Sequence, residues 1–290
     1  MVRIILLVSL LFGALNAHAD TLFEGYSKIV SGDKHIGYII TRYEFDNKKK
    51  QFISTYFLKT TGGGADITES LKAYADPELA PISYEYTTVV GKDTKTIDAK
   101  FKNGNMSAVI KSGKQVNRIE KKIPKGTFLS TFLVYLMLKS KEGLKSETKY
   151  EYQAIAEEEA SIQKGQALVG KEEKFNGYKA FKILNTFKDT KFLSYVNERG
   201  EVLGTNAMGQ GISTELVANP NDATAGIPVS TTLLKAIFGS VPAGLTNIVS
   251  EDSKAKSDVK VPATPSKQMG VPQGQGILLK GQPEKSEKGK

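Results

Sequence analysis

The chain has 290 residues, no cysteine, no tryptophan and a formal net charge of +9. Without cysteine it can form neither disulfides nor a thiol nucleophile, so a hydrophobic core must stabilise the fold, and the chain is long enough to bury one. The positive charge favours acidic partners, but the lysines are dispersed with no run of five like charges, which is typical of an excess that aids solubility.

The N-terminus has the layout of a secretory signal peptide over residues 1–19. Arg3 precedes an apolar run from Ile4 to Leu15, and Ala17-His18-Ala19 places small residues at both positions that a signal peptidase reads. We predict cleavage before Asp20 and localisation to the periplasm or outside the cell. An uncut membrane anchor is the alternative. The run is short for a membrane span and no second long apolar run follows, so we expect no transmembrane segment after cleavage.

From Gly25 to Thr205 the sequence predicts one strand after another. Apolar and polar residues alternate in the runs 34–47, 48–61 and 82–90, as in strands with one buried face. Asn103-Gly104 lies between two such runs and predicts a hairpin. Pro77 and Pro81 should end strand pairing, because proline lacks the N–H that a ladder needs. The pattern predicts a mainly β fold, a curved antiparallel sheet or partial barrel, over residues 20–226.

One apolar segment, at about 127–140, interrupts this rhythm. It is apolar nearly all round, Thr127 can cap its start and Gly143 lies beyond its end. We predict one long apolar helix that packs on the concave face of the sheet; a helix that enters lipid is the alternative. The residues that would form this core, or a ligand groove under the helix, are Phe128, Phe132 and Leu136 with the strand residues Tyr84 and Tyr86.

The C-terminal part changes in composition. Residues 227–250 contain one short helical pattern, at about 230–239, and read as a short helical or irregular extension. Residues 251–290 have no aromatic side chain and are rich in Lys, Ser, Pro, Gly and Gln. Such a segment buries too little apolar surface to offset its ordering entropy, so we predict a disordered tail that folding does not need.

The sequence offers few groups for catalysis or metal binding. His35 is the only histidine after the predicted cleavage site, and a lone histidine at a turn is more often a surface residue than a base. Glu157, Glu158 and Glu159 are the densest acidic group. On an extended chain their side chains alternate in direction, so we interpret them as a solvated acidic turn, with a calcium loop as the alternative.

Two short motifs match known sites by chance. Residues 165–172, GQALVGKE, resemble a phosphate-binding loop, but Glu172 stands where a Ser or Thr is needed, and the run reads as a strand. The matches to S-x-x-K at 31–34 and 146–149 fall in turns and not at a helix start. We therefore predict no catalytic, cofactor-binding or metal-binding residue, no cofactor and no enzymatic activity.

Four segments carry a family resemblance: HIGYIITRYEF, ADPELAPISYEY, GYKAFKILNTF and SYVNERGEVLGT. Over about residues 24–226 they resemble an exported β-rich domain of unknown function that occurs in Gram-negative bacteria, alone or ahead of transglutaminase-like domains. The resemblance implies a curved antiparallel sheet and no known catalytic residues. This chain departs from the longer arrangement, because the cysteine that a transglutaminase-like domain needs is absent.

Two classes of function follow from these patterns. The first is a non-enzymatic binding or scaffolding module of the cell envelope that docks a protein or a wall component. The second is a carrier of a lipid or other apolar ligand in a curved β groove. An anionic ligand is compatible with the charge, and we expect no nucleic acid. A filled concave face would favour the module, and an apolar cavity of several hundred cubic ångströms, roughly, would favour the carrier.

Overall fold

The computed structural model describes residues 19–61 and 66–258, so nearly all of the predicted signal peptide and most of the predicted tail lie outside it. The strands are β1 (Asp20–Ser31), β2 (Lys34–Asp46), β3 (Gln51–Thr60), β4 (Ile67–Ala75), β5 (Pro81–Val90), β6 (Asp93–Lys102), β7 (Asn105–Ser112), β8 (Gln115–Lys122), β9 (Phe128–Leu129), β10 (Lys149–Ala156), β11 (Ser161–Phe175), β12 (Tyr178–Phe187), β13 (Thr190–Val196), β14 (Val202–Ala207) and β15 (Ile212–Val217). The helical elements are the 3₁₀-helix η1 (Ser130–Phe132), α1 (Leu133–Lys139), α2 (Pro220–Thr224), α3 (Thr231–Phe238) and α4 (Ile248–Asp258).

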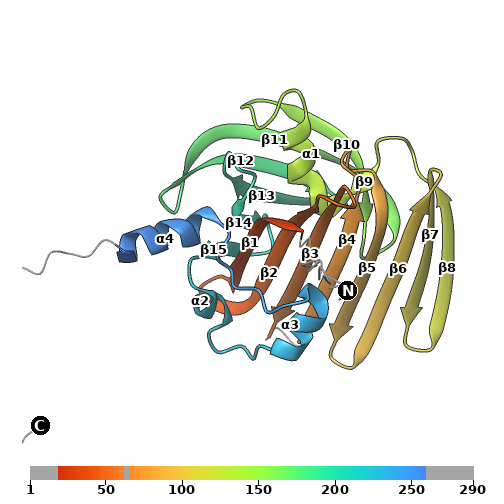
Figure 1. The fold of residues 1–290 in the computed structure, drawn as a ribbon, viewed down its shortest axis with the longest axis horizontal. Helices are drawn as coiled ribbons and strands as arrows, with labels where there is room; N and C mark the ends of the chain where they lie inside the picture. Colours follow the sequence, from red (N-terminus) through yellow and green to blue (C-terminus); the bar gives the residue numbers. More distant parts are fainter. Residues whose placement is uncertain (1–18, 62–65, 259–290) are drawn as a thin grey trace, which may run out of the picture.

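The strands form one open sheet in the order β8-β7-β6-β5-β4-β3-β2-β1-β15-β14-β13-β12-β11-β10-β9 (Figure 1). Every neighbouring pair is antiparallel except β9 and β10, which pair in parallel over two residues of each strand. The first and last strands of the chain meet at the centre, where Tyr26 of β1 lies opposite Val217 of β15. The predicted mainly β, antiparallel class is confirmed, and the sheet is not closed into a barrel.

Local turn chemistry accounts for the long run of hairpins. Asn103 and Gly104, between β6 and β7, have φ values of 52° and 73°. Residues with positive φ at both central positions give the turn whose twist matches two paired strands. The hairpin predicted there is confirmed. Pro81 is the first residue of β5 and lies opposite Ala75, a position where the missing N–H costs little.

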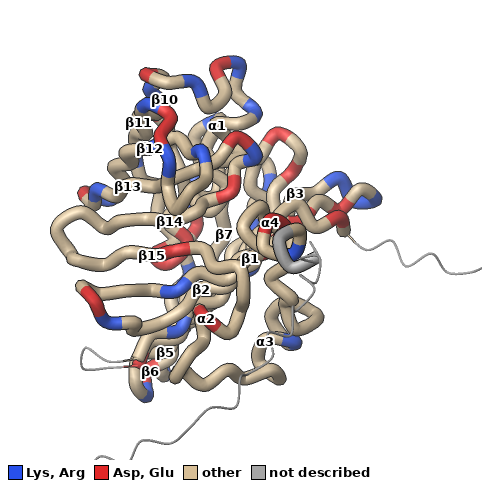
Figure 2. Tube along the Cα trace, turned by 90° about the vertical axis from the view of Figure 1, so that its left-hand side faces the viewer, with Lys and Arg blue, Asp and Glu red and all other residues tan. Residues whose placement is uncertain are grey.

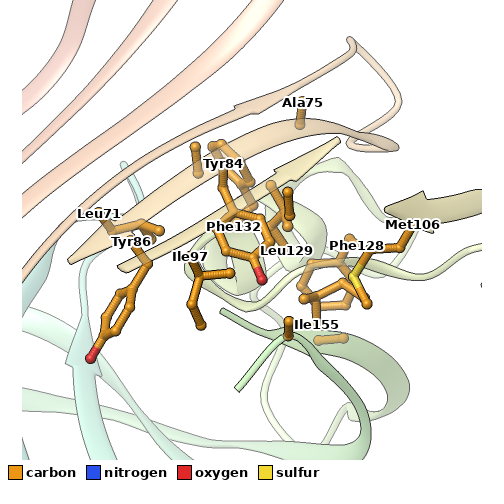
Figure 3. Close-up of a cluster of buried hydrophobic side chains, with 14 of the residues drawn as sticks. Leu71, Ala75, Tyr84, Tyr86, Ile97, Met106, Phe128, Leu129, Phe132 and Ile155 are labelled. Carbon is orange, nitrogen blue, oxygen red and sulfur yellow. The ribbon is translucent and has the colours of Figure 1, made fainter. Parts of the chain in front are cut away.

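The core forms where the sheet curls over itself. One cluster of buried side chains combines Leu71 and Tyr84 from the first half of the sheet with Phe128, Leu129 and Ile155 from its other end (Figure 3). Strands β9 and β10 therefore pack over the face of β4–β7. Side chains of β4–β7 and of β9–β10 are thus buried together, although these strands are far apart in the strand order.

The predicted long helix over 127–140 is wrong. Phe128 and Leu129 form a short strand, η1 follows, and α1 covers only seven residues. Thr127 does not cap a helix; its hydroxyl is buried and has no hydrogen-bond partner among the described residues. Pairing of β9 with β10 satisfies the backbone groups that a longer helix would have used. The segment still fills the concave face, because Phe132 and Met137 are buried there.

The C-terminal residues form a clasp, residues 238–250, on the outer face of β1 and β2. Helix α2 lies beside the same strands (Figure 1, Figure 2). Arg42 of β2 donates from Nη1 to the Phe238 carbonyl at 2.9 Å, and the Gly244 N–H donates to Oε1 of Glu24 at 2.6 Å. Asn247 is fully buried and its side-chain amide donates to the Glu24 carbonyl at 2.8 Å. The clasp thus depends on two charged residues of the sheet.

The prediction that disorder begins at residue 251 is wrong for its first residues. Residues 248–258 form α4, and Glu251 forms an ion pair with Arg199, with 2.7 Å between Oε2 and Nη1. Ser250, at the start of this helix, is buried, and its Oγ lies 2.8 Å from the Gly244 carbonyl oxygen and 3.1 Å from that of Ala218. No helix within residues 19–61 and 66–258 has the length and apolar character needed to cross a bilayer.

Candidate binding site

The parallel pairing of β9 leaves most of β10 with one free edge. On one side β10 pairs with β11 along its whole length, whereas β9 reaches only Ala154 and Ile155. Residues 149–153 have no second strand partner among the described residues. The Val169 N–H donates to the Thr148 carbonyl at 2.9 Å, so the backbone of Thr148 faces β11. Because backbone groups alternate along a strand, those of Lys149 and Glu151 face the free edge.

A groove of about 720 Å³ runs along this free edge, and we call it the edge groove. It lies among β10, β11, the connection that leads into β9 and one side of α1. Its lining combines apolar, amide and charged groups: Pro124, Lys125, Gly126, Leu136, Glu151, Tyr152, Gln153, Lys164, Gly165, Gln166 and Thr186. A groove beside an unpaired strand edge offers both backbone hydrogen bonds and side-chain pockets to an extended ligand.

The floor of the edge groove is held rigidly by Tyr152. A Cβ atom on Gly165, opposite Tyr152 in β11, would lie 2.4 Å from the tyrosine ring, so only glycine allows this close approach. The Tyr152 hydroxyl donates to Oδ1 of Asn185 at 2.6 Å, and its ring packs edge-on against Phe128 at 5.5 Å between centroids. Burial raises the pKa of Tyr152 to about 12, so the hydroxyl stays a donor at neutral pH.

Polar groups at the edge groove are incompletely paired. The Oε1 atom of Gln153 is buried and has no hydrogen-bond partner among the described residues. An unmade hydrogen bond of this kind costs about 1–3 kcal/mol, and an incoming N–H donor could recover it. Glu151 forms an exposed ion pair with Lys149 at 2.6 Å, while Lys125 and Lys164 add positive charge to the lining.

A second, smaller cavity lies on the concave face, and we call it the inner pocket. Its volume is about 200 Å³, and Ile39, Leu58, Tyr43, Tyr56 and Glu69 are among the residues that line it. Burial raises the pKa of Glu69, although hydrogen bonds from Tyr86 and Tyr56 oppose the shift. The inner pocket could hold a small group with hydrogen-bonding atoms, but it is too small for a lipid chain with its headgroup.

Glu157 joins the helical segment to the rest of the core. Its carboxylate accepts from Oγ of Ser130 at 2.5 Å and from the N–H of Thr131 at 3.2 Å, at the start of η1. The solvated acidic turn predicted for 157–159 is therefore wrong for Glu157, which is buried. Glu158 and Glu159 are at the surface, and both form ion pairs with Lys188. No cluster of three metal-ligating side chains occurs in the described part of the chain.

We expect Glu157 to make stability depend on pH. Burial raises its pKa from 4.5 to about 7, against the opposing hydrogen bonds from Ser130 and Thr131. The folded state therefore holds a proton more tightly than the unfolded state. Its stabilising effect is complete below pH 4.5, declines as the pH rises towards 7 and is lost above it. The decline should total about 3 kcal/mol.

Denaturant titrations at several pH values would measure this decline. In Glu157→Gln the decline of the free energy of unfolding between pH 4.5 and about 7 should disappear. The surface variant Glu120→Gln removes the same formal charge and is the control. Equal slopes in wild type and Glu157→Gln would show that this carboxyl is not buried as described.

The residues predicted as core or ligand groove divide between two places. Phe128, Phe132 and Tyr84 are buried within the main core, and Tyr86 is buried beside Glu69. Leu136 is partly buried and lines the edge groove. Burial raises the pKa of Tyr84, whose hydroxyl has no hydrogen-bond partner among the described residues. The structure thus assigns four of the five to packing.

Sequence reasoning missed the edge groove itself. Gly165 inside a predicted strand was its one local signal, because an interior glycine often marks a close approach. The resemblance of 165–172 to a phosphate-binding loop is accidental, since these residues lie in β11, as the sequence predicts. His35 is partly exposed, and its Nε2 lies 2.8 Å from the Gly37 carbonyl oxygen.

Comparison with known proteins gives little further information. No family model matches the sequence, and no curated protein matches it. A crystal structure of a DUF1089 family protein from Pseudomonas aeruginosa is similar over 61% of this chain and 91% of that chain, with 12% sequence identity and a TM-score of 0.37. We draw no conclusion about fold or function from a likeness of this extent.

Proposed function

We propose that this chain is an exported, non-enzymatic binding module of the bacterial cell envelope, which docks a partner protein as an added strand in the edge groove. The observation that carries the proposal is the free edge at 149–153, whose residues 151–153 line the edge groove of about 720 Å³. Backbone hydrogen bonds along such an edge would supply affinity, and the groove would select side chains. The export part of the proposal rests on the pattern of residues 1–19.

The filled concave face favours this proposal over a lipid carrier. Phe128 and Phe132 occupy the space under the sheet, which leaves the inner pocket of about 200 Å³ on that face. Ligand sites for drug-sized molecules occupy roughly 300–1,000 Å³. A carrier of a small amphipathic ligand in the inner pocket is the second candidate, and the inward-facing Glu69 and Tyr56 favour it.

A peptide-selection experiment tests the strand-docking proposal. Peptides selected from a random displayed library on the full chain should bind wild type and Glu151→Ala with similar affinity. They should bind Glu151→Pro at least about tenfold more weakly, because proline removes the edge N–H that pairs with an added strand. Proline is tolerated at sheet edges, and a thermal denaturation curve would verify that Glu151→Pro folds.

Two results would contradict the proposal. One is a library that yields no binder, and the other is a set of binders that tolerate Glu151→Pro. A small molecule that stays with the purified protein in native mass spectrometry, and that Glu69→Ala releases, would instead support the carrier.

A further inference from the structure

Most of the net positive charge lies at one end of the sheet. Residues 92–125, which we call the basic wing, comprise β6, β7 and β8 with their flanking turns. They contain ten Lys and Arg but three Asp and Glu, a net charge of +7 out of +9 for the chain. The sequence alone suggested dispersed charge, because the lysines are separated along the chain. Pairing of the strands places them side by side at the free end of the sheet (Figure 1).

The charges of the basic wing are not neutralised within the protein. None of its ten basic side chains takes part in an ion pair with another described residue. Lys95 donates to the backbone carbonyl of Glu158 at 2.7 Å. On the other half of the sheet both signs are interspersed (Figure 2), and pairs such as Lys28–Glu215 and Lys179–Glu172 form. The basic wing therefore presents a surface of strong net positive charge, in which three exposed carboxylates stand among ten basic side chains.

The basic wing is covered on its inner face by β9 and β10 over β6 and β7, whereas its last strand, β8, is largely exposed. In β8 seven of eight residues are exposed, and Ile119 is the residue of this strand that packs against the core cluster. Apolar side chains lie beside the lysines at one end of the wing: Val116 is 55% exposed, and Val90, the last residue of the neighbouring strand β5, is 43% exposed. Val116 lies opposite Lys111, and the Gly113 N–H donates to the Thr94 carbonyl at 3.3 Å, which brings both hairpin turns together. Asp93 and Asp66, whose carbonyl accepts from the Gly91 N–H, are acidic residues at this end.

We propose that the basic wing docks the protein onto the surface of an anionic phospholipid bilayer. Lysines around exposed valines match the bilayer interface, where headgroup phosphates attract the cations and the acyl boundary accepts the apolar groups. Nucleic-acid platforms built on strands use exposed aromatic side chains for base stacking. The aromatic residue of the basic wing, Phe101, instead packs on the core cluster. This inference does not depend on the edge groove.

Vesicle sedimentation with the full chain tests the inference. The protein should bind vesicles of phosphatidylglycerol mixed with phosphatidylcholine, and high salt or pure phosphatidylcholine should abolish binding. Each removed charge should weaken binding roughly fivefold, so Lys111→Gln/Lys114→Gln should lose more than tenfold. The matched control, Lys171→Gln/Lys174→Gln, removes two exposed lysines of β11 and should bind as wild type does. Val116→Ser should also weaken vesicle binding.

Three outcomes would overturn the proposal: absence of binding to the anionic vesicles, equal losses in the wing and control variants, or tighter binding to a nucleic acid that Val116→Ser does not change. The wing variants should still bind the peptides selected for the edge groove. Failure of vesicle binding is thereby distinguished from failure of the proposed function.

Discussion

Phe132→Ala should destabilise the protein by about 3–5 kcal/mol, because it leaves a cavity in the core that the neighbouring side chains fill only in part. Phe132 is fully buried, and its ring lies 6.3 Å from that of Tyr43 and 6.4 Å from that of Phe52 between centroids. A loss of this size is a large part of a domain's total stability. We expect poor expression or aggregation, and a large shift of the denaturant midpoint in any soluble fraction.

Two variants separate the cavity from other causes. Phe132→Leu keeps most of the volume and should cost less than Phe132→Ala. Leu136→Ala removes a partly buried side chain from the wall of the edge groove, so it should cost less stability while it alters peptide binding there. If Phe132→Ala melted as wild type does, the residue would be a lid over a hollow space, and binding of an apolar probe should then change instead.

Arg42→Ala should cost about 3–5 kcal/mol, because it leaves the carboxylate of Glu24 buried without its partner. The two side chains are each 8% exposed, and Nε of Arg42 donates to Oε2 of Glu24 at 2.6 Å. Arg42 also donates to the Phe238 carbonyl, and its guanidinium lies over the Phe238 side chain, 5.3 Å from the centroid of the ring. Its removal therefore also loosens the attachment of the clasp. Chemical denaturation would measure the loss.

The control is an exposed ion pair between β1, the strand of Glu24, and β15. Lys28 and Glu215 are 2.8 Å apart but their side chains are 35% and 36% exposed, so Lys28→Ala should cost less than about 1 kcal/mol. A chain that ends at Gly239 lacks the rest of the clasp and should itself be destabilised. In that shortened chain, Arg42→Ala should cost less than in the full chain, because Ser240, to which Arg42 donates from Nη2 at 3.3 Å, and the Gly244 N–H that donates to Glu24 are already lost. Additive losses would show that the ion pair and the clasp are independent.

Local patterns were enough to predict much of the sheet. The hairpin at Asn103-Gly104 follows from two residues that accept positive φ, and the start of β5 follows from Pro81. Neither depends on distant parts of the chain. The long apolar run after Thr127 predicted a helix because a continuous apolar segment has no periodicity that distinguishes a buried strand from a buried helix.

The segment that follows Thr127 was decided by residues far away in the sequence. Ala154 and Ile155 of β10 draw Phe128 and Leu129 into a parallel pair, and the carboxylate of Glu157 accepts hydrogen bonds from Ser130 and Thr131. A local cap was therefore unnecessary, and the expected role of Thr127 was wrong. No pattern within 127–140 carries information about these partners.

The sequence by itself determined the fold class, the antiparallel hairpins and the apolar residues that form the core, because alternation and turn chemistry act between neighbours along the chain. Only the tertiary structure decided three features: that the apolar segment is strand, 3₁₀-helix and short helix; that β10 keeps a free edge beside the edge groove; and that the lysines of β6–β8 gather on one wing. Each depends on pairing between strands. The free energy of that pairing comes from contacts between residues that are far apart in the sequence, and local sequence patterns carry no information about them.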